Sequence, residues 1–239
     1  MIEVKSLTKT YGKKQHTFTA LDDVSFTIPD GASVAILGKS GSGKSTLMHA
    51  MSGLDRPQVG EVIINGEDIL KLKTKAVDKF RATKMSFIFQ SFFVQANETC
   101  FDNVSLPLEI AGVSHAERKK KVTAALEAVE LGDKIKSKAK NLSGGQKQRL
   151  AVARAIVNEP EVLFADEPTG NLDSTTGDVI EDLLFGYAKR NGMTLIIVTH
   201  DADLAAKCDI EVRIKDGKIE SISEPRKKEV TKPAPRRIQ

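Results

Sequence analysis

The sequence predicts an α/β fold with a mainly parallel sheet, and three observations support this prediction. Short apolar runs with the length of buried strands recur along the chain. Stretches with the apolar spacing of amphipathic helices lie between several of them, an alternation typical of parallel sheets. The chain has 239 residues, of which 40% are hydrophobic and 28% charged, an ordinary globular composition. The length is sufficient for one large domain or two small ones, and the composition excludes a fibrous or wholly disordered chain.

The predicted strands are short and mostly apolar. Ser33–Leu37 and Val162–Ala165 predict buried strands, as does Leu195–Val198. Glu61–Gly66 predicts a strand that is closed by an Asn-Gly turn. Val212–Ile222 places an Asp-Gly pair between alternating apolar residues, which indicates a β-hairpin. Because the first three runs are apolar apart from Ser33, we expect other elements to cover these strands on both faces.

Two capping boxes predict where helices begin. Ser114 with Glu117 precedes apolar residues spaced i, i+3, i+4 and i+7, which indicates an amphipathic helix. Thr175 with Asp178 precedes a second apolar stripe, and Gly192 suits the C-terminal cap of that helix. The charged residues between the apolar positions are then the solvated faces of these helices.

The stretch from about residue 91 to 142 predicts helices and contains no strong strand signal. We interpret it as a helical subdomain inserted into the α/β core. Its first part, from Ser91 to Phe101, is unusually apolar. Two interpretations of this part stay open here: it is core of the helical subdomain, or it lines a groove for a helix of a partner protein.

The net charge of +4 is confined to one end of the chain. Residues 224–239 hold six basic and two acidic residues, so the rest of the chain is neutral. Bulk charge therefore gives no support to a nucleic-acid-binding domain. The basic tail is rich in proline, and we expect residues 223–239 to be disordered. They would either increase the solubility of the chain or bind anionic lipid headgroups.

Membrane spans and disulfides are not expected. No apolar run approaches the roughly 18 residues of a membrane span, and the N-terminus has no secretory signal pattern. The chain has only two cysteines, Cys100 and Cys208. Their small number fits a reducing compartment, so we predict no disulfide.

Residues 38–45 carry the strongest chemical signal. They match the phosphate-binding pattern G-x-x-x-x-G-K-S and follow a predicted strand. Glycines let backbone N–H groups wrap around an anion, and the next helix adds the positive end of its dipole. We expect Lys44 to reach the β- and γ-phosphates of a nucleotide and Ser45 to bind Mg²⁺ through its hydroxyl. The predicted nucleotide-binding residues here are Gly38, Lys39, Ser40, Gly41, Ser42, Gly43, Lys44, Ser45 and Thr46.

Two carboxylates follow the apolar strand Val162–Ala165. The C-terminal end of a parallel strand faces the ligand crevice of such sheets, so we expect Asp166 to hold Mg²⁺, directly or through water. Glu167 lies one residue further on and points elsewhere. It is suited to orient and deprotonate a water that attacks the γ-phosphate. The pair is a weak signal alone and a strong one together with the phosphate loop.

Ser143, Gly144, Gly145 and Gln146 form a second candidate anion site. Ser143 can cap a helix expected over Lys147–Val157, and the two glycines expose the N–H groups of its first turn. A plain flexible loop before a helix also explains a glycine pair. From the glycines alone we favour this simpler explanation.

Together these motifs resemble those of the ATP-binding subunits of ABC transporters, over about residues 1–222. The resemblance implies a P-loop NTPase core, a small antiparallel β subdomain and an inserted helical subdomain at about 91–142. It also implies ATP as the nucleotide, with Mg²⁺. Leu142–Gln146 matches the family's signature sequence in full, which removes the flexible-loop alternative.

Further residues match functional positions of this family. Gln90 matches the Q-loop glutamine, which contacts Mg²⁺ and senses the partner, and His200 matches the histidine that contacts the γ-phosphate. Asp173 lies in the match to the D-loop. Tyr11 matches the aromatic residue that stacks on adenine, although Phe18 is a nearby competitor. The implied catalytic residues are Lys44, Gln90, Glu167 and His200, and the implied metal ligands are Ser45, Gln90 and Asp166.

Lys39 is a departure from the family pattern, because many relatives have proline there. Side chains at the variable positions of a phosphate loop need not contact phosphate, since backbone N–H groups bind the anion. We therefore expect the lysine to be tolerated.

The family resemblance also implies partners. In the family, the signature sequence of one subunit closes over ATP held by the phosphate loop of another. We therefore expect a homodimer with ATP sandwiched at its interface. The expected second partner is a transmembrane permease subunit, and family position favours the segment from Ser91 to Phe101 as its docking groove. The chain would be peripheral, on the cytoplasmic face of the plasma (inner) membrane, and we expect no nucleic-acid partner.

Gly170–Asp173 and Asn103–Leu108 resemble one branch of the family. This branch includes the macrolide-exporter, lipoprotein-release, antimicrobial-peptide-resistance and cell-division ATPases, whose permeases transmit force across the membrane. The alternative is an ATPase switch that controls an extracytoplasmic cell-wall enzyme through a permease-like partner, without cargo. A third interpretation, a soluble ABC protein acting on DNA or ribosomes, has less support. Those proteins usually carry two cassettes or a long coiled-coil insertion.

Overall fold

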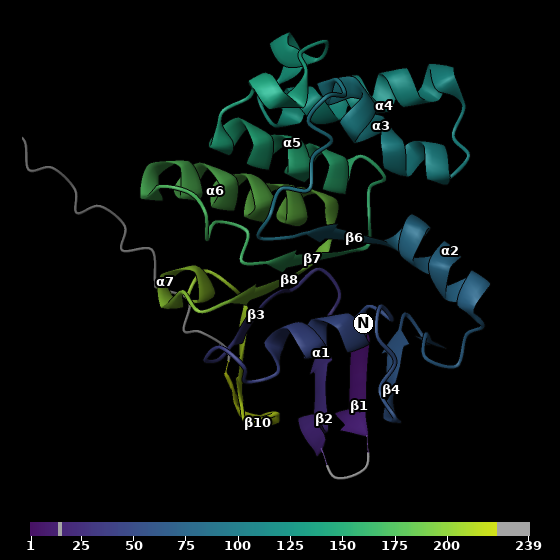
Figure 1. Ribbon diagram of the computed structural model, residues 1–239, viewed down its shortest axis with the longest axis vertical. Coiled ribbons are helices and arrows are strands. Elements are labelled where there is room, and N and C mark those ends of the chain that lie inside the picture. Colours follow the sequence, from purple (N-terminus) through teal and green to yellow (C-terminus); the bar gives the residue numbers. More distant parts are fainter. Residues whose placement is uncertain (14–15, 224–239) are drawn as a thin grey trace, which may run out of the picture.

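Six strands form the larger sheet in the computed structural model, which describes residues 1–13 and 16–223 (Figure 1). Their order is β10-β9-β3-β8-β7-β6, and neighbours are parallel except for β10 against β9. The mainly parallel sheet is therefore confirmed. The strands are β3 (Ser33–Leu37), β6 (Met85–Ile88), β7 (Val162–Asp166), β8 (Thr194–Thr199), β9 (Ile210–Lys215) and β10 (Lys218–Ser223). The predicted basic tail lies, from residue 224 on, outside the described residues.

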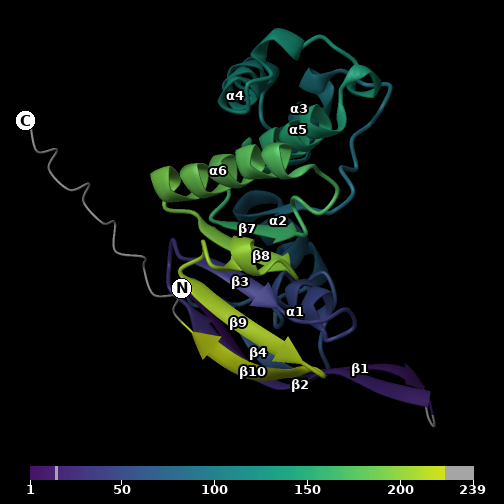
Figure 2. The same cartoon turned by 90° about the vertical axis from the view of Figure 1, so that its left-hand side faces the viewer.

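An antiparallel sheet of four strands is the second sheet of the described residues, in the order β2-β1-β4-β5. It confirms the small antiparallel part that the family resemblance implies. The β1–β2 hairpin is long and extends beyond the body of the protein in Figure 2. The strands are β1 (Ile2–Lys13), β2 (His16–Ile28), β4 (Val59–Ile64) and β5 (Glu67–Asp68).

Helices cover both faces of the larger sheet. The helices α5 and α6 lie on one face, with α3 and α4 packed on α5, and α1 lies on the other face, between the two sheets (Figure 1, Figure 2). Short α7 follows β8, and α2 precedes β6. The bounds are α1 (Lys44–Met51), α2 (Thr74–Lys84), α3 (Cys100–Ile110), α4 (His115–Ala128), α5 (Gly144–Ile156), α6 (Ser174–Asn191) and α7 (Ala202–Ala205).

Alternate residues of β3 enter two separate hydrophobic cores, because successive side chains of a strand point to opposite faces. Val34 and Ile36 pack with α1 and the antiparallel sheet, in a cluster that includes Leu47. Ala35 and Leu37 pack with the helices on the other face. This burial on both faces is the reason why β3 is a continuous apolar run in the sequence.

The two predicted β-turns form where expected. Asn65 and Gly66 follow β4 with φ of +52° and +85°. Asp216 and Gly217 join β9 to β10 with φ of +48° and +78°. Positive φ at both central residues is typical of the tight turns that connect antiparallel strands. Both strand pairs are antiparallel, as these turns predict.

Two predicted N-caps are confirmed, with differences in detail. Ser114 caps α4 by accepting a hydrogen bond from the amide of Glu117 (3.4 Å), but only this half of the predicted capping box forms. Ser143 caps α5, which begins at Gly144 and not at the predicted Lys147. The helix begins directly after the cap because the cap oxygen satisfies an amide of the first turn.

The predicted start of α6 is wrong. This helix begins at Ser174, and its N-cap is Asp173 and not Thr175. The Asp173 carboxylate accepts hydrogen bonds from the amide (3.0 Å) and the hydroxyl (2.7 Å) of Thr176. An ionised acceptor with two donors is a stronger cap than a lone hydroxyl. Gly192, with φ of +63°, ends the helix as predicted.

The stretch from 91 to 142, all of which the structure describes, contains helices and no strand, as predicted. That it forms a separate subdomain with these bounds stays a prediction. It contains α3, α4 and two 3₁₀ turns. In its apolar first part, Val94 and Phe101 pack against the core, whereas Phe93 is 67% exposed. This segment therefore contributes both to the core and to the surface.

Cys100 and Cys208 are both buried and free, as predicted. None of the helices among the described residues combines the length and the hydrophobicity that a bilayer crossing requires.

Candidate functional site

Loops that carry predicted site residues follow four neighbouring strands of the larger sheet. Gly38 follows β3, His200 follows β8, Glu167 follows β7, and Gln90 lies just beyond β6. These strands are consecutive in the order β3-β8-β7-β6 and are parallel. Their carboxyl ends therefore meet at one edge of the sheet, where ligands bind in open α/β sheets.

The phosphate-binding loop joins β3 to α1. Lys44 donates hydrogen bonds from Nζ to the carbonyl oxygens of Gly38 (2.8 Å) and Lys39 (3.0 Å). Gly43 is the N-cap of α1, with φ of +107°. A Cβ at Gly43 would lie 2.5 Å from the carbonyl oxygen of Ala20. Only glycine fits this position, so the turn from loop to helix depends on it.

The start of α1 is open to an anion. No side chain caps its first N–H groups, and no acidic residue lies in its first turn. These N–H groups carry the positive end of the helix dipole. The buried Ser42 hydroxyl has no hydrogen-bond partner among the described residues. A phosphate chain held by the loop would supply the missing acceptors at the helix start, so the residues present fit a nucleotide.

Asp166 ends β7 and faces the first turn of α1. Ser45 donates from its hydroxyl to Asp166 Oδ2 at 3.4 Å. Burial raises the pKa of Asp166, and the negative charge of Glu167 raises it further. A cation would relieve this crowding of negative charge. Two of the predicted metal ligands therefore lie together.

Glu167 is held by the end of β8 and by the loop that follows it. Its backbone lies in the left-handed region, with φ of +48°, and its amide donates to the carbonyl of Val198 (2.8 Å). Glu167 Oε1 faces Nδ1 of His200 at 2.7 Å, and Oε2 accepts from the Thr199 hydroxyl at 3.3 Å. The predicted base and the predicted γ-phosphate contact therefore touch each other.

Gln90 lies close to the predicted D-loop. Its backbone carbonyl accepts a hydrogen bond from Asn171 Nδ2 (2.8 Å). A Cβ at Gly170 would lie 3.5 Å from Gln90 Nε2, so the amide of Gln90 approaches the loop that follows β7. Asp173 is engaged as the cap of α6, and hydrogen bonds from Thr176 keep the pKa of its carboxyl below the usual range.

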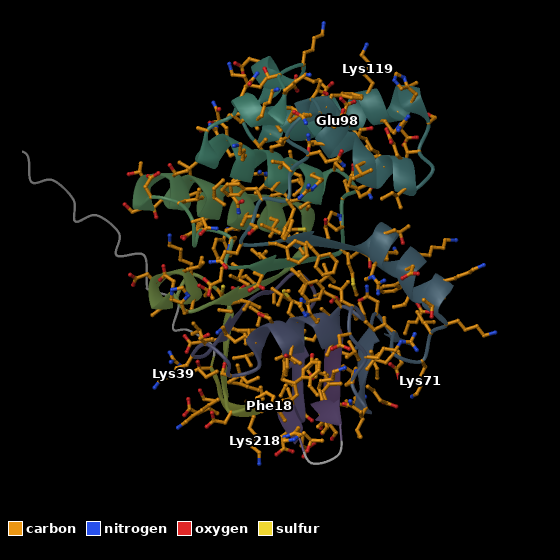
Figure 3. All side chains as sticks on the ribbon, in the orientation of Figure 1. Phe18, Lys39, Lys71, Glu98, Lys119 and Lys218 are labelled. Atoms are coloured by element: carbon orange, nitrogen blue, oxygen red, sulfur yellow. The ribbon has the colours of Figure 1, made fainter. Side chains whose placement is uncertain are left out.

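Tyr11 and Phe18 lie opposite each other in the β1–β2 hairpin. Tyr11 donates its hydroxyl to Asp55 Oδ2 (2.7 Å). Burial raises the pKa of Tyr11 and the bond to Asp55 adds to this, whereas the side chain of Thr46, on α1, lowers it. Phe18 is 62% exposed on the surface of the hairpin (Figure 3). Tyr11 is thus the member of the pair that is tied to the helix after the phosphate loop.

The signature loop starts α5 with a complete capping box. The Gln146 amide donates to Ser143 Oγ (3.3 Å), and the Ser143 amide donates to Gln146 Oε1 (3.0 Å). A Cβ at Gly144 would meet nothing within 4 Å, whereas one at Gly145 would lie 2.5 Å from Thr176 Cγ2. Gly144 therefore faces open space, and Gly145 allows α5 to pack closely against α6.

The signature loop and the phosphate loop lie in different layers of the molecule. α5 covers one face of the larger sheet and α1 covers the other (Figure 1). The side-chain hydrogen bonds of Ser143 and Gln146 are made within their own loop. The fold therefore gathers the strand-end residues into one site and leaves the signature residues apart from it.

A cleft of about 660 Å³ runs along the outer side of the phosphate loop. Residues 37–42, His200 and parts of the β9–β10 hairpin line it. Lys44 and Asp166 are not among its lining residues, so the cleft lies beside the expected phosphate position. Lys39 is exposed at the edge of the molecule (Figure 3), in agreement with its expected tolerance.

Some residues that hold the site together belong to no recognised motif. Thr199 bonds to the predicted base, and Asp55 bonds to Tyr11. Gln148, buried in α5, donates to the backbone of the loop after β7. Lys9 lies over the ring of Tyr11. None of these contacts has a signal in the sequence, because they join residues whose pairing depends on the tertiary structure or on a strand with an irregular register.

Comparisons with known proteins agree with these motifs. Residues 21–170 match the protein family described as ABC transporter. YbbA of Escherichia coli K12, an uncharacterized ABC transporter ATP-binding protein, is 43% identical over 220 residues, which are 92% of this chain and 96% of YbbA. The lipoprotein-releasing system ATP-binding protein LolD of Syntrophus aciditrophicus is 41% identical over 219 residues, 92% of this chain and 98% of LolD.

A solved structure is similar over nearly the whole chain. It is the dimeric ATP-binding cassette MJ0796 in a post-hydrolysis state, bound to ADP and Pi. The TM-score is 0.86 at 38% sequence identity, and the alignment covers 95% of this chain and 99% of that one. At this identity the similarity extends beyond the fold to the family.

Proposed function

Because this chain belongs to the ABC transporter family as an ATP-binding ATPase cassette, we propose that it powers a membrane transporter of the exporter or mechanotransmission type. Two copies would join when ATP binds between them and separate after hydrolysis. The observation that carries the ATPase part of the proposal is the contact between Glu167 and His200 at 2.7 Å, on the same sheet edge as the phosphate loop. Similarity to a lipoprotein-releasing ATP-binding protein supports this branch of the family.

Each residue has a part in hydrolysis that follows from its position. Lys44, now bonded to carbonyls of its own loop, would turn to the β- and γ-phosphates. Glu167 would orient the attacking water and take its proton, which is the work of a general base. His200, which contacts the Glu167 carboxylate, would bind the γ-phosphate and so align this base with the reacting phosphorus.

Ser45, Asp166 and Gln90 are the residues that would hold Mg²⁺. Among the described residues no group of three or more His, Cys, Asp and Glu side chains is arranged to hold a metal ion. As is usual for Mg²⁺, these few protein ligands would hold the ion together with phosphate oxygens and water. When bound, Mg²⁺ would neutralise charge on the β- and γ-phosphates.

The signature loop of a second copy would close over the nucleotide. Ser143, Gly144 and Gly145 place the first N–H groups of α5 at an exposed helix start, where an anion is favoured. The open space at Gly144 would admit the phosphates of ATP held by the other copy. A head-to-tail pair with two-fold symmetry completes both sites at once.

A transmembrane permease is the partner through which hydrolysis would do work. An apolar groove of about 310 Å³ lies between α2, α3 and β6, and its lining includes no residue of the segment from Ser91 to Phe101 that the sequence favours for docking. Leu106 and Ile110 of α3 line it and are 36% and 70% exposed. Exposed apolar residues at helical spacing beside a groove are suited to receive a short helix of a partner. The chain would then be peripheral, on the cytoplasmic face of the inner membrane.

The segment after Gln90 would transmit movement between this groove and the signature loop. Arg154 of α5 donates to the carbonyl oxygens of Phe93 (2.7 Å) and Phe92 (3.0 Å). The ring of Phe93 packs edge-on against Phe89, and Phe89 stacks on Phe87, which lines the groove. A partner helix that displaces this segment would therefore act on α5, whose N-terminus is the signature loop.

A pair of variants tests the ATPase site. Glu167→Gln keeps the shape of the side chain and removes the base. We expect ATP binding to persist while the hydrolysis rate falls by about 10²- to 10⁴-fold. Lys44→Ala should lose nucleotide binding, because its ammonium is the charge aimed at the phosphates. Titration calorimetry with ATP and a phosphate-release assay measure the two effects.

The matched control is Glu127→Gln, the same exchange at an exposed position of α4. This variant should hydrolyse ATP at the rate of the unmodified chain. Unchanged turnover in Glu167→Gln, or unchanged binding in Lys44→Ala, would contradict the proposed site.

A further inference from the structure

Lys9, Tyr11 and Asp55 form a compact cluster beside the first turn of α1. The two oxygens of Asp55 are used separately. Oδ1 accepts from Lys9 Nζ (2.5 Å), and Oδ2 accepts from the Tyr11 hydroxyl (2.7 Å). Lys9 Nζ also donates to the carbonyl of Arg56 (2.8 Å) and lies 4.9 Å from the centre of the Tyr11 ring.

We infer that Lys9 and Asp55 are positioning residues for the base of the nucleotide: they fix the Tyr11 ring so that one face is free to stack on a purine. The inference rests on the proposed function, in which ATP binds at the adjacent phosphate loop. It goes beyond that function because it assigns how the stacking surface is built. Neither Lys9 nor Asp55 would touch the base, and both would act through Tyr11.

The cluster is built for rigidity. The Lys9 side chain is only 8% exposed, so its ammonium is held within the protein, and Asp55 is 36% exposed. Burial would raise the pKa of Asp55, but the hydrogen bonds from Lys9 and Tyr11 outweigh it and keep the pKa low. Asp55 therefore stays ionised at neutral pH and accepts from both donors.

The position of Lys9 decides which face of the ring is available. An ammonium over an aromatic face is attracted by the ring electrons and occupies that face. Tyr11 is nevertheless 41% exposed. The exposed part of the ring can therefore accept a base, which stacks on aromatic side chains irrespective of its hydrogen-bonding edges.

Fixing the ring in advance increases affinity. A free side chain loses rotamer freedom when a ligand binds, and a side chain that is already held does not. Phe18, opposite Tyr11 in the hairpin, lies outside this hydrogen-bonded cluster. The geometry thus selects Tyr11 over Phe18 as the preorganised stacking surface.

The test compares ATP with inorganic tripolyphosphate, which has the phosphate chain but no base. Titration calorimetry in the presence of Mg²⁺ measures both affinities for the full chain and for Asp55→Ala. We expect Asp55→Ala to weaken ATP binding by about 2- to 10-fold, the cost of ordering a free side chain. Tripolyphosphate binding should not change. The matched control is Glu61→Ala on β4, which removes an ion pair to Lys71 elsewhere on the same sheet.

Two further variants keep the inference falsifiable if Asp55→Ala folds poorly. Tyr11→Phe retains the ring and loses only the hydrogen bond of the hydroxyl to Asp55. It should therefore weaken the binding of ATP and leave the binding of tripolyphosphate unchanged. In a Tyr11→Ala background, Asp55→Ala should have no further effect on the affinity for ATP, because Asp55 acts through the Tyr11 ring.

If Asp55→Ala weakened the binding of ATP and of tripolyphosphate equally, the inference would be overturned, since Asp55 would then have a general role in the fold near α1. Unchanged ATP affinity in Asp55→Ala and Tyr11→Phe would also overturn it. If the unmodified chain binds tripolyphosphate and ATP equally, no stacking surface exists and the inference alone fails. If it binds neither, the proposed function fails and this inference fails with it.

Discussion

Glu167 has a strained backbone conformation, and its side chain contacts Thr199 and His200. Its φ of +48° is uncommon for a residue with a Cβ, and such a conformation costs about 1–3 kcal/mol. The bond from its amide to Val198 and the contacts of its carboxylate with Thr199 and His200 hold it in place. These contacts with the end of β8 and with the loop after it therefore offset the strain, and the Glu167 carboxylate faces His200.

Cys208 should be chemically inert in the folded protein. Burial raises the pKa of its thiol to about 12, and the charge of Asp209 adds to the shift. Only the thiolate is a good nucleophile, so at pH 8 its alkylation by iodoacetamide should be about a thousandfold slower than in the unfolded chain. Timed alkylation followed by mass spectrometry measures both rates, with the urea-unfolded chain as the control. Similar rates in the two states would refute the burial of this thiol.

Single residues also define the limit of prediction from sequence. The residues of the phosphate loop, Asp166, Glu167 and His200 are recognisable because each follows an apolar strand in a known pattern. Asp55 is not recognisable from the sequence as a partner of Tyr11. The two residues are 44 positions apart and come into contact only in the folded chain. Contacts over such separations depend on the tertiary structure and leave no local periodicity in the sequence.

At the scale of elements, α5 connects the parts of the site. Its N-terminus is the signature loop, capped by Ser143. In its middle, buried Gln148 donates to the carbonyl of Pro168, directly after Glu167. Near its end, Arg154 holds the segment that follows Gln90. A movement of α5 would therefore reach both the loop that carries the predicted base and the segment that follows Gln90.

The two glycines of the signature loop should respond differently to alanine. A Cβ at Gly144 enters open space, so Gly144→Ala should keep the stability of the fold and block the approach of a second copy's ATP. A Cβ at Gly145 would lie 2.5 Å from Thr176, whose hydroxyl is held by Asp173, so the crowding cannot relax easily. Gly145→Ala should therefore lower the free energy of unfolding by about 1–3 kcal/mol.

Urea unfolding of the two variants measures this difference, and each variant serves as the control of the other. The account of the loop would be wrong if both variants lost the same stability. It would also be wrong if Gly144→Ala were the less stable of the two.

Elements buried on both faces are the ones that the sequence predicts well. β3, β7 and β8 are apolar except at their end residues, and the sequence predicts their ends to within about one residue. β1 and β2 are absent from the predicted strands, because irregularities between Val4 and Thr10 break the alternation of a strand. α2 has Val77 as its one buried residue, so it lacks an apolar stripe.

At the scale of the whole molecule, the larger sheet separates two functional surfaces (Figure 1). The phosphate loop lies with α1 on one face of the larger sheet, and the signature loop lies with α5 on the other (Figure 1). The family resemblance implies two half-sites per chain, and this arrangement agrees with that expectation. One chain holding ATP at its phosphate loop would still need the signature loop of a second chain.

The mass of the Glu167→Gln variant in ATP tests this account most directly. Because this variant should bind ATP without hydrolysing it, sedimentation in ATP and Mg²⁺ should give twice the mass of one chain. In ADP the same protein should sediment as a single chain. Adding Gly144→Ala should also return the mass in ATP to that of a single chain. A single-chain mass for Glu167→Gln in saturating ATP would contradict the claim that ATP joins two copies of this protein.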